Sequence, residues 1–210
     1  MSRREVRARP VRPRNAASLV ILRGEGASTE VLLGKRHSRH RFMPDVYVFP
    51  GGAVDPRDHR TPALKPLPDT LRRRLETKWP GTMAQALPTA ALRETWEETG
   101  LIFGSVQDGA LRPDLSQVDL VARAITPVDS PIRFHARFFL ARGEAAAGTL
   151  ADSRELHDLG WVPIAEALTR PLVDVTEFVL QEVERRLQGW QAPGLPLFSY
   201  RGGGPRIRYE

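Results

Sequence analysis

The chain contains no cysteine and no long apolar run. The absence of Cys among its 210 residues excludes disulfide scaffolds, cysteine-ligated zinc or iron–sulfur sites, and thiol catalysis. The densest apolar stretch, residues 16–22, is seven residues long, whereas a helix that crosses a bilayer needs about 18 or more. The sequence therefore predicts no membrane span, and any metal must be bound by oxygen or imidazole ligands.

The positive charge is concentrated at the N-terminus. The formal net charge is +6, and residues 1–14 carry six arginines against Glu5, so residues 15–210 hold only +1 of it. A nearly neutral body argues against a nucleic-acid-binding face. We interpret the basic arm as a solvated tail, with binding to phosphate or to an acidic surface as the alternative. No apolar segment follows the arginines as it does in a secretory signal, so we expect a cytoplasmic protein.

Hydrophobic periodicity predicts one mixed α/β domain. The length fits a single core, and strands interrupted by a few helices are typical of an α/β fold. We expect strands at residues 16–22, 31–36, 46–49, 101–103, 120–125, 132–142 and 159–162, and helices at 69–79, 84–99 and 175–187. The predicted organisation is a basic arm at 1–14, one domain at 15–190 and an extended, Gly- and Pro-rich tail at 191–210.

Three carboxylates share one face of the second predicted helix. Glu94, Glu97 and Glu98 are related as i, i+3 and i+4, which places them within about one third of the helix circumference. Like charges at this spacing repel one another, and a hard divalent cation would offset the repulsion. Without cysteine or paired histidines, Mg²⁺ or Mn²⁺ fits best. The alternative is an ordinary solvated acidic face.

The residues around the three glutamates favour a metal site over a solvated acidic face. Arg93 precedes the first glutamate, Gly100 ends the helix, and the turn Phe49-Pro50-Gly51-Gly52 lies upstream. Together these residues resemble the Nudix hydrolase superfamily, whose signature is Gly, five residues, Glu, seven residues, then Arg-Glu-apolar-any-Glu-Glu-any-Gly-apolar. The resemblance implies a Nudix fold, in which a mixed β-sheet is sandwiched between helices.

The first half of the signature departs from the pattern. Counted forward from Gly52, the first acidic position is Asp58, and 34 residues rather than seven separate it from Arg93. Counted backward from Arg93, the same position is Gln85. The chain therefore contains a helical insertion of about 27 residues, at about 57–83, and either residue can replace the first glutamate. We expect Trp79 and the leucines of the insertion to pack against the body or a partner chain, with a lid as the alternative.

The resemblance assigns roles to the second half of the signature. It implies that Glu94, Glu97 and Glu98 bind Mg²⁺ or Mn²⁺, with help from a backbone carbonyl of Gly51 or Gly52. Arg93 would orient a glutamate, and Glu94 is the candidate general base. In some relatives a later loop supplies an additional acid. Glu155 resembles that position, and Glu144 and Asp152 compete with it.

The substrate class follows from a second, weaker resemblance. Leu32-Leu33, Arg36, Arg41 and the Phe49 turn have the spacing of the motif that precedes the box in coenzyme A diphosphatases, although Met43 and Asp45 replace the His and Gly expected there. This favours coenzyme A or an acyl derivative as substrate. The candidate cations for its phosphates are Arg36, Arg39, Arg41, Arg133 and Arg137.

Several alternatives stay open. Arg133, His135 and Arg137 alternate along a predicted strand, and they suit either a substrate or a wet sheet face. Other possible substrates are dinucleotides, ADP-ribose and capped RNA. A ligand sensor that kept the fold and lost turnover is the alternative outside enzymes. The expected partner is a small nucleotide-diphosphate molecule, and a homodimer is left open.

Overall fold

A computed structural model describes residues 11–38 and 43–210 of the chain. The strands are β1 (Arg14–Arg23), β2 (Glu30–Arg36), β3 (Tyr47–Val48), β4 (Gly51–Ala53), β5 (Leu101–Ile102), β6 (Gly104–Gln107), β7 (Ala110–Pro113), β8 (Asp119–Ile125), β9 (Phe134–Arg142), β10 (Ala147–Gly148), β11 (Leu156–Pro163), β12 (Pro196–Arg201) and β13 (Gly204–Tyr209). The helices are α1 (Asp69–Glu76), α2 (Gly81–Thr99), α3 (Ile164–Ala167) and α4 (Asp174–Leu187).

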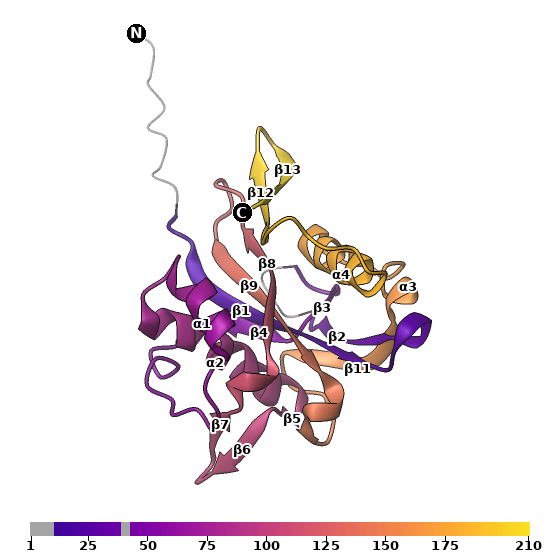
Figure 1. The fold of residues 1–210 in the computed structure, drawn as a ribbon. Coiled ribbons are helices and arrows are strands. Elements are labelled where there is room, and N and C mark those ends of the chain that lie inside the picture. The colour runs from indigo at the N-terminus through magenta and orange to yellow at the C-terminus, as the bar shows by residue number, and fades with distance from the viewer. Residues whose placement is uncertain (1–10, 39–42) are drawn as a thin grey trace.

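A mixed sheet lies between two helical layers (Figure 1). Its strand order is β11-β2-β1-β9-β8-β12-β13, with β3 beside β2 and β4 beside β1. One layer consists of α1 and α2, and the other consists of α3 and α4. The predicted mixed α/β fold with a sheet between helices is confirmed.

The central strand β1 is apolar on both faces. Leu19 and Ile21 belong to the core shared with α1 and α2, whereas Val20 and Leu22 belong to the core shared with α4. Successive side chains of a strand point to opposite faces, so one unbroken apolar run supplies both cores. This is why the segment is a buried strand rather than a half-exposed one.

Helix α2 begins three residues earlier than predicted and ends as predicted. Gly100 follows it with φ +77°, and its N–H donates to the Trp96 carbonyl over 2.9 Å. A Cβ at Gly100 would lie 2.5 Å from the Thr149 carbonyl oxygen. A glycine is therefore required on both conformational and steric grounds, and it fixes where the glutamates before it stand.

The insertion packs against the body of the same chain. Leu71 and Leu75 of α1 are buried in the core that α2 shares with the sheet, and Trp79 packs against that core. The loop before α1 is pinned as well, because Leu64 N–H donates to Pro113 O over 2.8 Å and Leu115 N–H donates to Lys65 O over 3.0 Å. This arrangement corresponds to the first of the expected alternatives.

The C-terminal segment is more ordered than an extended tail. Strand β12 pairs parallel with β8, and β13 folds back on β12 as a hairpin. The sequence analysis also missed the β6–β7 hairpin. No helix in residues 11–38 and 43–210 combines the length and the hydropathy that a bilayer crossing requires.

Candidate active site

A cavity of about 450 Å³ opens at the junction of the sheet, the end of α2 and the start of α4. This volume suits a nucleotide-sized ligand. Its polar lining includes Arg14, Ser18, Arg36, Glu94, Glu98 and Glu155, and its apolar lining includes Phe49, Phe134, Ala136, Phe138 and Phe198. Carboxylates and aromatic surfaces therefore face one space.

Glu94 and Glu98 present their carboxylates to this cavity. Glu98 is almost fully buried and accepts a hydrogen bond of 2.8 Å from Gly51 N–H. Burial, with the charges of Glu94 and Glu155 adding to it, raises the pKa of Glu98 to about 8. Burial also raises the pKa of Glu94. Both carboxyls therefore hold protons more tightly than ordinary glutamates, as expected where a cation is the natural counter-charge.

The two glycines before the box allow this close approach. Strand β4 pairs with β1, with Gly51 opposite Ser18 and Gly52 opposite Ala17. A Cβ built on Gly52 would lie 2.5 Å from Glu94 Oε1. Only glycine at position 52 leaves room for that carboxylate.

Arg93 holds three carboxylates at once. Its Nε lies 2.8 Å from Asp58 Oδ1, and its NH1 donates to Glu94 Oε1 over 2.8 Å and to Glu97 Oε2 over 3.0 Å. Burial opposes the charge of Arg93, but Asp58 and Glu94 outweigh burial and raise its pKa. The arginine is thus a fixed cation that positions Glu94.

The structure distinguishes the two candidates for the first acid of the box. Asp58 is fully buried, and its second oxygen accepts from Arg93 NH2 over 3.1 Å and from Asp55 N–H over 2.7 Å. Gln85 donates instead to the Thr61 carbonyl over 3.2 Å. Asp58 therefore contacts Arg93, and Gln85 does not take that place.

Of the three candidates for the additional acid, Glu155 lines the cavity. Glu144 accepts from Gly24 N–H over 3.0 Å, and Asp152 accepts from the backbone N–H groups of Asp158 and Leu159 in β11. Neither of these two lines the cavity. Arg36 does line it, and its charge interacts with both Glu98 and Glu155.

Neither Arg133, just before β9, nor Arg137, on β9, lines this cavity, which corrects the sequence analysis. Arg137 is fully buried on the opposite face of the strand, where its guanidinium lies 4.5 Å from the centre of the Trp79 ring. Arg133 donates to the carbonyls of Thr126 and Val11. The sequence analysis predicted that cationic and aromatic side chains alternate along this strand, but the aromatic side chains, not the cationic ones, line the cavity. Arg39 and Arg41 lie outside the described residues.

The apolar half of the cavity was missed. Phe134, Ala136 and Phe138 come from β9, Phe198 and Tyr200 come from β12, and residues 173–176 come from the start of α4. The Phe-Ser-Tyr alternation near the C-terminus is a strand signal, but the sequence does not say which sheet that strand joins.

The carboxylates are compatible with a divalent cation without forming a finished metal site. Within residues 11–38 and 43–210, no three His, Asp or Glu side chains converge closely enough to be a preassembled metal centre. Glu97 is ion-paired to Arg93 and does not line the cavity. Glu94 and Glu98 do line it, and Gly52 leaves space beside Glu94. An all-oxygen donor set of this kind suits Mg²⁺ or Mn²⁺.

Comparison with known proteins places the chain in a family. The NUDIX domain model matches residues 12–183. A curated Caenorhabditis elegans protein, named as nudix hydrolase 7, is 26% identical over 180 residues. That alignment covers 74% of this chain and 53% of the relative, so the chain spans about half the length of that protein.

Solved structures agree with the family assignment. A NUDIX hydrolase from Alicyclobacillus acidocaldarius superposes with a TM-score of 0.62 at 28% identity, covering 81% of this chain and 90% of that one. The NUDIX domain of Shewanella oneidensis NrtR in complex with ADP ribose has a TM-score of 0.53 at 17% identity, covering 84% and 90%. The match at low identity shows the shared fold alone. The chain belongs to the Nudix hydrolase family.

Proposed function

We propose that the chain is a metal-dependent pyrophosphohydrolase that cleaves the diphosphate of a nucleoside diphosphate linked to another group, with coenzyme A or acyl-coenzyme A as the favoured substrate. The observation that carries this proposal is one cavity in which the buried Glu98 and the half-buried Glu94 of α2 face aromatic side chains. Aromatic surfaces stack a base, and carboxylates with a divalent cation hold a diphosphate. Mg²⁺ or Mn²⁺ is the cation we propose.

The proposed hydrolysis assigns a role to each of the glutamates of α2 and to Arg93. A divalent cation held by Glu94 and Glu98, with Glu97 as a third candidate ligand, would neutralise the diphosphate and favour attack by water. Glu94 accepts the proton of the attacking water while Arg93 holds its carboxylate in place. The water oxygen bonds to one phosphorus, and the bridging oxygen leaves with the other phosphate.

Other residues of the cavity bind and steer the substrate. Arg36 offers a cation to the phosphates beside Glu98 and Glu155. Glu155 is a candidate second acid. The ion pair between Asp58 and Arg93 supports an enzyme over a non-catalytic ligand sensor, because the altered first acid was the reason for considering a sensor. A cytoplasmic location and a homodimer remain predictions.

The test is a substrate panel with Mg²⁺ or Mn²⁺, read by mass spectrometry. The panel contains coenzyme A, acetyl-coenzyme A, NADH, ADP-ribose, an oxidised nucleoside triphosphate and capped RNA. We expect coenzyme A to give 3′,5′-ADP and 4′-phosphopantetheine. If neither coenzyme is hydrolysed but ADP-ribose or a dinucleotide is, coenzyme A is not the substrate, and the proposed diphosphate hydrolysis still stands. Tight ligand binding without products in any lane would favour the sensor.

A further inference from the structure

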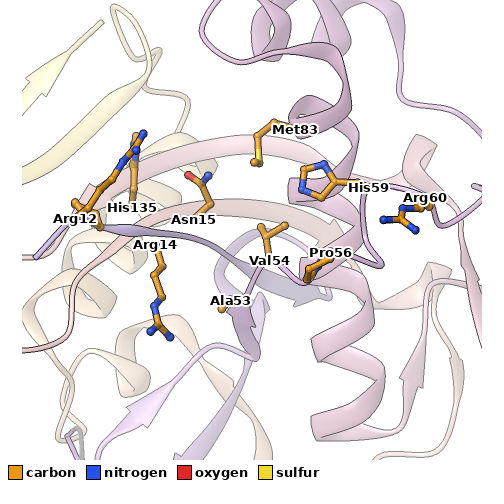
Figure 2. Close-up of a pocket in the computed structure, with 11 residues that line it drawn as sticks. Arg12, Arg14, Asn15, Ala53, Val54, Pro56, His59, Arg60, Met83 and His135 are labelled. Atoms are coloured by element: carbon orange, nitrogen blue, oxygen red, sulfur yellow. The ribbon is translucent and has the colours of Figure 1, made fainter.

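Figure 2 shows the side chains that line a second cavity, of about 780 Å³. Its polar lining comes from the start of β1, the loop after β4, and β9. Figure 2 shows Arg12, Arg14 and Asn15 on one side and His59 and Arg60 on the other, with His135 behind Arg12. None of the described residues that line it is acidic. Nothing in the proposed hydrolysis uses this space.

The arginines that line the second cavity have no ion-pair partner in residues 11–38 and 43–210. Among the described residues, the guanidinium groups of Arg12, Arg14 and Arg60 form no ion pair. By contrast Arg57, in the same loop as Arg60, pairs with Asp55 over 3.0 Å. Three uncompensated cations around one hollow create a local positive potential.

A buried arginine stands directly behind the wall of this cavity. Arg137 is fully buried, and its NH1 donates to Asn15 Oδ1 over 2.7 Å. Within the described part of the chain, its Nε and NH2 have no hydrogen-bond partner. Burial, with Arg123 adding to it, lowers the pKa of Arg137, yet an arginine keeps its charge at neutral pH. Because Asn15 Oδ1 accepts from this arginine, the asparagine has its NH₂ group left to offer to the cavity.

His135 also presents a donor. Burial, followed by the charges of Arg137 and Arg123, lowers the pKa of His135 to about 3, so the ring is neutral. Its Nε2 lies 2.9 Å from Arg123 NH2, and an arginine can only donate. The ring proton is therefore on Nδ1. The wall combines arginine, asparagine and histidine N–H donors, which matches a group that only accepts hydrogen bonds.

The second cavity shares two lining residues with the first, although Asn15 and His135 lie on the opposite face of the sheet from Ala16 and Phe134. Arg14 and Ala53 line both, and Ala53 directly follows the Gly51-Gly52 pair beside Glu94. We propose that the second cavity binds a phosphate monoester carried on the same molecule whose diphosphate lies in the first cavity. This inference rests on the proposed function and deepens it. The substrate class is a nucleoside diphosphate derivative with an additional ribose phosphate, a description that includes coenzyme A.

The first test measures binding in EDTA and does not need turnover. Isothermal titration calorimetry compares adenosine 3′,5′-bisphosphate with adenosine 5′-monophosphate. Two charge-assisted hydrogen bonds predict a preference for the bisphosphate of about tenfold or more in the wild type. Arg12→Gln with Arg60→Gln removes cations that line the second cavity and not the first, so the preference should fall to near unity. The matched control is Arg73→Gln with Arg201→Gln, two exposed arginines elsewhere, which should keep the preference.

The second test compares hydrolysis of coenzyme A with that of 3′-dephospho-coenzyme A. We expect the ratio of their kcat/KM values to be about ten or more in the wild type and in the control, and near one in the Arg12→Gln, Arg60→Gln variant. Unchanged thermal unfolding of that variant confirms its fold. Equal losses on both substrates, or a wild type without preference, would overturn the proposal.

The two tests together distinguish failure of the proposed reaction from failure of the proposed phosphate site. If neither coenzyme is hydrolysed but the bisphosphate preference depends on Arg12 and Arg60, the proposed reaction fails and the phosphate site survives. If inorganic phosphate binds together with 3′-dephospho-coenzyme A, and only when the two arginines are present, the phosphate comes from a separate molecule. That result would overturn the assignment to a phosphate on the substrate.

Discussion

Asp58 and Arg93, 35 positions apart, form a two-pronged ion pair, with 2.8 Å between Arg93 Nε and Asp58 Oδ1 and 3.1 Å between Arg93 NH2 and Asp58 Oδ2. The Asp58 side chain is fully buried, and the Arg93 side chain is 13% exposed. The pair therefore joins the loop after β4 to the helix that carries the glutamates, across the whole insertion.

Asp58→Asn should destabilise the protein strongly. Arg93 keeps Glu94 and Glu97 as partners, but the substitution weakens the charge-assisted hydrogen bonds of a fully buried carboxylate, which are worth about 1.5–3 kcal/mol each. Gln85→Ala removes one hydrogen bond, worth about 1 kcal/mol. Urea unfolding of both variants checks the difference. If the two losses are equal, Asp58 does not play the structural part assigned to it.

Gly52→Ala should impair catalysis more than folding. The new methyl group meets the Glu94 carboxylate at 2.5 Å, and that flexible side chain can swing aside at small cost in stability. Displacing the proposed base by about 1 Å predicts a fall in kcat of about 100-fold. The control is Gly160→Ala, where nothing lies within 4 Å of the added carbon. Wild-type turnover in Gly52→Ala would mean that the position of Glu94 is not critical.

His135 should make the protein sensitive to acid. Its pKa is about 3 in the folded chain, because burial and then the charges of Arg137 and Arg123 disfavour the imidazolium, while Glu210 partly opposes them. Between pH 6.5 and 3 the unfolded chain binds a proton that the folded chain refuses, so the free energy of unfolding falls as the pH falls.

His135→Gln should reduce that loss. Thermal unfolding of both proteins in EDTA at pH 7, 5 and 4 isolates the effect of this histidine, since other acid-sensitive groups are common to both. The wild type should lose more stability than the variant over this range. Parallel curves would show that His135 is protonated in the fold.

Leu75→Ala tests whether the insertion is part of the core. Leu75 is fully buried between α1 and the body, so its truncation should cost about 2–5 kcal/mol. Leu64 is 43% exposed and lies in the same insertion, so Leu64→Ala should cost less than about 1 kcal/mol. Denaturant unfolding compares the two. Similar small losses would mean that α1 moves independently, as a lid does.

The sequence predicted what depends on local spacing. The helical grouping of Glu94 and Glu98 and the stop at Gly100 follow from 3.6 residues per turn and from the conformational freedom of glycine. The alternation of cations and aromatics on β9 was also predicted, but which face meets the cavity depends on the packing of Trp79 against Arg137 and on the position of β12 in the sheet. Long-range contacts of this kind, like the ion pair between Asp58 and Arg93, are absent from any local window.

The most direct test of the central claim is the turnover of Glu98→Gln with Mg²⁺ or Mn²⁺, on whichever panel substrate the wild type hydrolyses fastest. Glutamine can still accept the Gly51 N–H bond but cannot offer a carboxylate to a cation. We predict a folded protein whose kcat falls by about 100-fold or more, while the exposed control Glu25→Gln keeps wild-type turnover. Full activity in Glu98→Gln, or hydrolysis that persists undiminished in EDTA, would contradict the account.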